Sequence, residues 1–140
     1  MKVTAVVDTN VLVAGILSAN EHSPVCQVLD GMLAGRFPFL LSHDLLDEYR
    51  RVLLRQKIRD LHGLTPEQID LLLTQIVANA MIREPRPAPA APDPGDDHLW
   101  QLLRTEAAPV LVTGDQRLLE QPPDFASVVS PRAFLDLLGP

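Results

Sequence analysis

Four acidic positions carry the residue types best suited to chemistry in this chain. Asp8 directly follows a short apolar run at residues 3–7, and Asp115 follows a second run at residues 110–113 after one glycine. Because the carboxyl ends of parallel strands form the edge where sites are built, both carboxylates should emerge on the same edge. Carboxylate oxygens are ligands that suit hard cations such as Mg²⁺ or Mn²⁺.

Two further acidic positions can join this edge. Glu48 lies three residues after Leu45 and four before Val52, which places it beside the inward-facing stripe of a helix. Asp96 and Asp97 lie where a proline-rich loop meets a helix, and either can point toward the same edge. Each acid alone also has a structural explanation as a helix cap or ion-pair partner. Together they would repel one another, so the set favours a cation site.

The elements that must position these acids alternate between strands and helices. Short apolar, β-branched runs predict strands at residues 3–7, 37–41, 110–113 and around 128–129. Apolar periodicity and caps predict helices at residues 10–17, 24–34, 43–53, 66–80, 96–106 and 116–120, with a last one entered at residues 130–131. This alternation predicts an α/β fold, with a largely parallel central sheet and helices on both faces.

Length and composition indicate one domain spanning residues 1–140. The chain is 46% hydrophobic, which is enough for its own core, and residues 84–95 should form a proline-rich internal loop. The single cysteine, Cys26, favours a reducing compartment. The absence of a signal-peptide pattern or a membrane-length apolar run leads us to expect a soluble cytoplasmic protein. The net charge of −6 argues against a general nucleic-acid coat protein, but not against a metal-dependent nuclease.

Other site types lack their usual motifs. The four histidines, at positions 22, 43, 62 and 98, do not have zinc-ligand spacing, and no phosphate-binding loop, dinucleotide fingerprint or nucleophile elbow is present. A local excess of basic residues includes Arg50, Arg51 and Arg55. These arginines are candidates for contacting a phosphate backbone, and the alternative is the solvated face of a helix.

Five segments follow one another in a specific order and spacing. They are Val-Val-Asp-Thr-Asn-Val-Leu-Val at residues 6–13, Leu-Ser-His-Asp-Leu-Leu-Asp-Glu-Tyr at 41–49, Asp-Pro-Gly-Asp-Asp-His at 93–98, Leu-Val-Thr-Gly-Asp at 111–115 and Ser-Pro-Arg-Ala-Phe-Leu at 130–135. In this order they resemble a PIN domain, and within that family the VapC-like toxins of bacterial toxin–antitoxin pairs. The resemblance extends over nearly the whole chain.

The resemblance implies an endoribonuclease that uses Mg²⁺ or Mn²⁺ and a metal-activated water. Carried over residue by residue, the acidic site falls on Asp8, Glu48, Asp96 and Asp115. The family often has Asp-Asn where this chain has Asp96-Asp97, so a shared ligand role for Asp97 stays open. Expected polar supports are Asn10, Ser42 and Thr113. The resemblance also implies a cognate antitoxin that covers the acids, and a homodimer.

Three alternatives are open. The first is a PIN fold that binds RNA or protein without catalysis. The second is a phosphotransferase or phosphatase with Asp8 as nucleophile; it lacks a second acid at position 10 and a late lysine, since the only lysines are Lys2 and Lys57. The third is a metal-independent ribonuclease that uses His43 and His98, although solvated surface histidines are the simpler interpretation.

Overall fold

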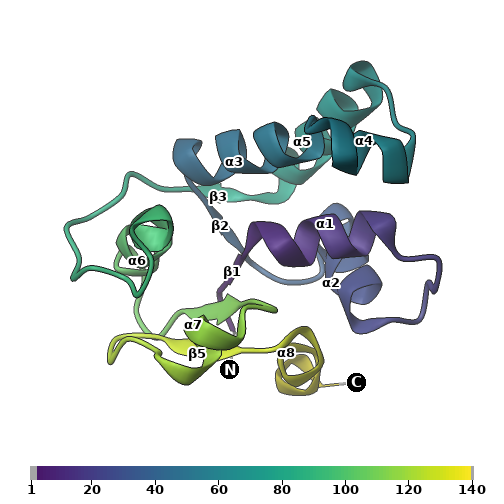
Figure 1. Ribbon diagram of the computed structural model, residues 1–140. Coiled ribbons are helices and arrows are strands. Elements are labelled where there is room, and N and C mark those ends of the chain that lie inside the picture. Colours follow the sequence, from purple (N-terminus) through teal and green to yellow (C-terminus); the bar gives the residue numbers. More distant parts are fainter. Residues whose placement is uncertain (1–2, 140) are drawn as a thin grey trace.

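The computed structural model describes residues 3–139, in which strands and helices alternate (Figure 1). The strands are β1 (Ala5–Val7), β2 (Leu40–Leu41), β3 (Met81–Ile82), β4 (Val110–Val112) and β5 (Ser127–Val129). The helices are α1 (Thr9–Leu17), α2 (Pro24–Ala34), α3 (His43–Leu53), α4 (Gln56–His62), α5 (Pro66–Asn79), α6 (Asp97–Leu103), α7 (Gln116–Glu120) and α8 (Pro131–Leu138), with a short 3₁₀ turn at Pro94–Asp96.

All strand pairs are parallel. One sheet has the order β1-β4-β5, and β2 pairs with β3. A bridge between Ala5 and Phe39 connects the two sheets side by side. β1 and β4 run in register, with Val7 opposite Val112, so Asp8 and Thr113 leave the sheet at the same edge. The predicted α/β fold with a parallel sheet is therefore confirmed.

The buried strands explain why their sequences are apolar throughout. β1 and β4 are buried along their whole length. In Figure 1, α6 lies on one side of these strands and α1 and α2 lie on the other. A strand covered on both faces has no solvated side on which polar residues would be favoured, which accounts for the absence of alternation.

Capping residues fix where several helices begin. Ser23 accepts a hydrogen bond from the Cys26 amide at the start of α2, and Thr65 forms a capping box with Gln68 at the start of α5. Gly35 ends α2 in the left-handed region, at a φ of 67°. These boundaries agree with the sequence predictions because each depends on residues within one turn of the helix end.

Several segments differ from the sequence predictions, including α6, which covers Asp97–Leu103 rather than residues 96–106. β2 covers residues 40–41 rather than 37–41, because Pro38 has no amide hydrogen to donate to a strand ladder. β3 was not predicted, since two residues of strand have no detectable periodicity. Likewise, α4 was not predicted as a separate helix; it buries no residue completely, so its apolar pattern is weak.

The proline-rich segment packs against α6 and α7 through a few hydrogen bonds. Residues 83–91 form neither helix nor strand. The Arg86 amide donates to the Gln101 carbonyl at 3.1 Å, and Arg117 Nη2 donates to the Pro92 carbonyl at 2.8 Å. Within residues 3–139, no helix is both long and apolar enough to cross a membrane.

Candidate active site

The four predicted acids line one cavity at the carboxyl ends of β1 and β4. The cavity has a volume of ≈ 430 Å³ and lies between α1, α3 and the segments that precede α6 and α7. Its lining residues are Asp8, Thr9, Asn10, Val13, Ala14, Leu17, Glu48, Val52, Asp96 and Asp115. Residues more than 100 positions apart in the chain therefore meet at one place.

Asp8 is the most buried of these acids, with 5% of its surface exposed. As the N-cap of α1, its Oδ1 accepts a hydrogen bond from the Thr9 amide at 2.8 Å. Its Oδ2 accepts from Thr113 Oγ1 at 2.8 Å and from Asn10 Nδ2 at 3.2 Å. Burial raises the pKa of Asp8, and these hydrogen bonds oppose the shift only in part. The charges of Glu48 and Asp115 raise this pKa further.

Asn10 and Thr113 connect the segments that follow β1 and β4. Asn10 Oδ1 accepts from the Gly114 amide at 3.0 Å, and Thr113 Oγ1 accepts from the Asp115 amide at 3.0 Å. These contacts fix the positions of two of the acids relative to each other. Ser42, the third predicted support, does not line the cavity. It accepts from the Leu45 amide at 3.1 Å and caps α3, the helix that carries Glu48.

Glu48 pairs with His98, a contact that the sequence analysis did not predict. His98 Nε2 lies 2.9 Å from Glu48 Oε2, and the two side chains are 15% and 21% exposed. The contact with His98 is the main reason that the pKa of Glu48 is lowered, against the effect of burial. Burial lowers the pKa of His98, but the hydrogen bond and charge of Glu48, with the charges of Asp44 and Asp96, together raise it, and the net shift is upward.

The interpretation of His98 as a solvated surface histidine is thus wrong, because its side chain is 15% exposed and forms an ion pair with Glu48. The cause is the packing of α3 against α6, which brings positions 50 residues apart into contact.

The neighbouring aspartates Asp96 and Asp97 point to different places. Asp96 lines the cavity, where burial and then the charges of nearby acids, beginning with Asp8, raise its pKa to about 6. Asp97 Oδ1 accepts a hydrogen bond from the Ala91 amide at 2.8 Å and holds the proline-rich segment. Asp97 does not line the cavity. The structure therefore separates two acids that sequence reasoning left as alternatives.

Asp115 combines a structural contact with a place in the cavity. It is the N-cap of α7, and its Oδ1 accepts a hydrogen bond from the Arg117 amide at 2.9 Å. The capping role considered from sequence is therefore present for both Asp8 and Asp115. It does not remove either carboxylate from the cavity.

The donor chemistry of the cavity fits a hydrated divalent cation. Among residues 3–139, no three Asp, Glu, His or Cys side chains are grouped closely enough to ligate one ion together. Mg²⁺, however, usually keeps several waters and takes one or two carboxylates directly. Glu48 Oε2 is occupied by His98, so it is not a spare acceptor. The repulsion among the carboxylates is what favours a cation with its waters.

This crowding of charge predicts how stability changes with pH in the absence of metal. Because the pKa of Asp96 in the fold is about 6, against 3.8 for the unperturbed group, folding favours the protonated form. The contribution of Asp96 to the free energy of unfolding is therefore fully present below pH 3.8 and is lost as the pH rises through 6. In EDTA, the Tm of Asp96→Asn should exceed that of the wild type at pH 7.5, and the difference should shrink toward pH 4.

Differential scanning fluorimetry across this pH range measures the effect. Asp70→Asn is the control, because Asp70 is exposed and its hydrogen bond with Arg50 lowers its pKa. That variant should not raise the Tm at pH 7.5. An Asp96→Asn protein that is no more stable than wild type at pH 7.5 would show that neither burial nor the nearby acids disfavour the ionised form of Asp96.

The predicted basic residues are on or directly after α3, the helix that carries Glu48, and none of them lines the cavity itself. Arg50 Nε pairs with Asp70 Oδ1 at 2.8 Å on the surface. Arg51 and Arg55 line an adjacent hollow of ≈ 580 Å³ with Asp47, Arg50 and Leu54. Within residues 3–139, no carboxylate lies within ion-pair distance of Arg51 or Arg55, so both are free to meet an anion.

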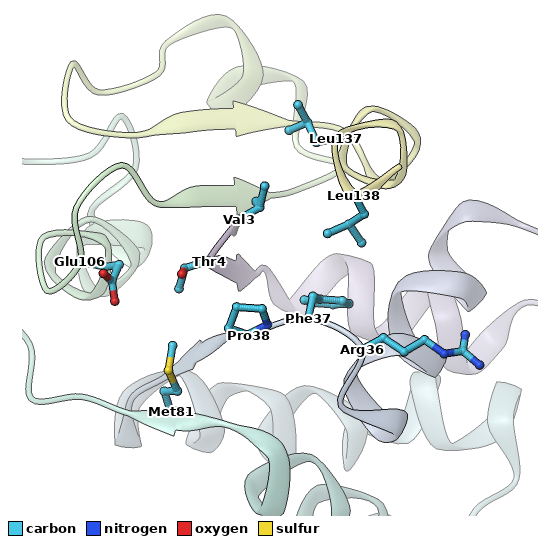
Figure 2. Close-up of a pocket in the computed structure, with 9 residues that line it drawn as sticks. All are labelled: Val3, Thr4, Arg36, Phe37, Pro38, Met81, Glu106, Leu137 and Leu138. Atoms are coloured by element: carbon cyan, nitrogen blue, oxygen red, sulfur yellow. The ribbon is translucent and has the colours of Figure 1, made fainter. Parts of the chain in front are cut away.

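A second cavity, of ≈ 480 Å³, lies at the opposite end of the strands (Figure 2). It is lined mainly by apolar side chains, among them Val3, Phe37, Met81 and Leu137. Its acidic residue Glu106 pairs with Arg83 at 3.6 Å. A cavity with one paired carboxylate lacks the converging oxygen groups of the first, so we place the chemistry at the carboxyl ends of the strands.

Comparison with known proteins identifies a family. A family model described as PIN domain matches residues 4–117. This range includes all four acids of the cavity. A search of curated proteins gives no match.

Proposed function

Because the chain belongs to the PIN domain family, we propose that it is an endoribonuclease that depends on Mg²⁺ or Mn²⁺. PIN domains are generally nucleases. The observation that carries the proposal is the convergence of four carboxylates on one cavity: Asp8, Glu48, Asp96 and Asp115. Because such a convergence is costly without a cation, the cavity is better suited to metal-assisted hydrolysis than to structural capping alone.

The roles of the acids follow from their surroundings. Asp8 would be the central ligand of the cation, Asp96 and Asp115 would complete the site directly or through the cation's waters, and Glu48 would bind or orient those waters. When bound, the cation supplies an activated water for in-line attack on phosphorus and charge that stabilises the leaving oxygen. Hydrolysis forms a bond from the water oxygen to phosphorus and breaks the bond to the 3′-oxygen, which takes up a proton. The products are a 5′-phosphate and a 3′-hydroxyl.

The protein's own residues hold this arrangement in place. Thr113 and Asn10 donate hydrogen bonds to Asp8, which keeps its Oδ2 in one orientation. Ser42 caps the helix that carries Glu48, and His98 restrains the Glu48 carboxylate from the other side. Ligands held in this way bind a cation with little reorganisation.

Arginines beside the cavity would contact the RNA backbone. Of the three candidates, Arg50 is engaged with Asp70 and is the weakest. Arg51 lies close enough to Glu48 for its charge to lower the pKa of that acid. Arg51 and Arg55 are therefore the better partners for the phosphates that flank the scissile bond.

The biological role that we propose is that of the toxin in a type II toxin–antitoxin pair. It is supported by the resemblance of the five sequence segments to VapC-like proteins. In this role a small antitoxin would cover the acids, and a basic side chain of the antitoxin would pair with the carboxylates. The nuclease would act as a homodimer in the cytoplasm. The single cysteine, Cys26, is buried and agrees with a reducing compartment.

The experiment that tests catalysis uses purified protein and end-labelled RNA in Mg²⁺ or Mn²⁺, with an EDTA control. We expect cleavage that is lost in EDTA, restored by added metal, and leaves 5′-phosphate ends. Cleavage that survives EDTA would contradict the metal-dependent mechanism and favour histidine chemistry. If folded, metal-supplied protein cleaved none of a varied set of RNAs, the alternative would hold, namely a PIN fold that binds RNA or protein without catalysis.

A further inference from the structure

The cavity that holds the four acids also has an apolar wall. α1 presents Val13, Ala14 and Leu17 to the cavity, and α3 presents Val52. Leu17 lies four residues after Val13 and three after Ala14, so the three side chains share one face of α1. Because Asp8 is the N-cap of this helix, the wall begins beside the acids and reaches Leu17 roughly 13 Å farther along the axis.

The wall is built into the fold yet open to a ligand. Leu17 and Val52 pack against the hydrophobic core on one side, and both remain half-buried rather than fully covered. Their exposed atoms therefore belong to the cavity. Aliphatic side chains carry no hydrogen-bond donor or acceptor, so this part of the cavity can bind only an apolar surface.

We propose that this wall binds the face of the nucleobase next to the scissile phosphate. The inference rests on the proposed function, since it requires RNA in the cavity. A nucleotide is anionic at its phosphate and has apolar faces on its base. It therefore matches a cavity whose acids hold a cation at one end and whose helices offer aliphatic carbon at the other. A free phosphate would leave the wall unused, and an apolar ligand would leave the acids unused.

The apolar chemistry of the wall limits which features of an RNA base the protein can recognise at this position. Hydrogen bonds to base edges carry sequence information, whereas contact with a base face is available to every base. In a duplex, neighbouring base pairs cover these faces. The wall therefore requires an unpaired base and accepts any of the four at this position.

Binding of short RNA tests the wall without depending on turnover. We would measure fluorescence anisotropy with labelled octauridylate, and with a ribose-phosphate octamer that lacks bases, both in Ca²⁺. Wild-type protein should bind octauridylate at least about fivefold more tightly than the abasic chain. Leu17→Ala should weaken octauridylate binding about fivefold and leave abasic binding unchanged.

Two further variants separate base contact from general effects. Leu17→Phe keeps an apolar surface and should retain the preference for octauridylate. Leu71→Ala is the matched control, because Leu71 is 63% exposed on α5 and does not line the cavity. Leu71→Ala should bind octauridylate as tightly as the wild type does. Thermal unfolding of each variant checks that it is folded.

The possible outcomes distinguish this inference from the proposed function. If wild-type protein bound both chains equally, or if Leu17→Ala weakened both or neither, the wall would not bind bases, although RNA cleavage would stand. Absence of binding to either chain would overturn the proposed function and this inference together.

Discussion

Replacing Asp8 by asparagine should lower the rate of metal-dependent RNA cleavage by at least about 100-fold while the protein stays folded. Loss of a residue that only hydrogen-bonds to a metal ligand already lowers metal affinity or activity by about 10- to 100-fold. Loss of a direct ligand should lower the cleavage rate at least as much. Asparagine keeps an Oδ1 that can accept from the Thr9 amide, so the cap of α1 is preserved. It loses the negative charge that would hold the cation.

The measurement is the single-turnover cleavage rate of a labelled RNA at saturating Mn²⁺, with far-UV circular dichroism to confirm folding. Asp97→Asn is the matched control. Asp97 is an aspartate one residue from Asp96, but its carboxylate accepts from the Ala91 amide outside the cavity, and asparagine can accept the same bond. The cleavage rate of Asp97→Asn should stay within about threefold of the wild-type rate. This change is much smaller than the one expected when a hydrogen bond to a metal ligand is lost. A large loss in Asp97→Asn with little loss in Asp8→Asn would refute the site as assigned.

Replacing Thr113 by valine should reduce both stability and activity, because one hydroxyl serves two of the acids. Thr113 Oγ1 donates to Asp8 Oδ2 at 2.8 Å and accepts from the Asp115 amide at 3.0 Å. Thr113 is completely buried, and valine there would remove the shorter of the two side-chain hydrogen bonds to Asp8 Oδ2. We expect a loss of about 1–3 kcal/mol in the free energy of unfolding, and a fall in cleavage rate of about 10- to 100-fold.

Urea unfolding and the cleavage assay measure the two effects on the same variant. Thr113→Ser keeps the hydroxyl and should recover most of the activity, which a merely space-filling role would not predict. Thr74→Val is the control, because Thr74 bonds only the exposed Asp70 carbonyl on α5. If Thr113→Val cleaved RNA at the wild-type rate, the orientation of Asp8 would not depend on this contact.

Local signals account for the parts of the fold that the sequence predicted well. Helix starts were predictable because caps such as Ser23 and Thr65 act within one turn of the chain. Buried parallel strands were predictable because both faces require apolar residues. The placement of Asp8 and Asp115 at one edge followed from the strand direction alone. Short or weakly amphipathic elements, β3 and α4, have no comparable local signature.

From the sequence alone, most strands and helices could be predicted in their order, together with the position of Asp8 and Asp115 at one edge of the sheet. Which of the two adjacent aspartates faces the cavity could not be predicted, since Asp96 ends a 3₁₀ turn and Asp97 begins α6, and the way this junction packs sets both directions. The tertiary structure also decided that His98 restrains Glu48, because that contact depends on how α6 packs against α3. Side-chain direction depends on the rotation of each packed helix, and packing between distant segments sets that rotation.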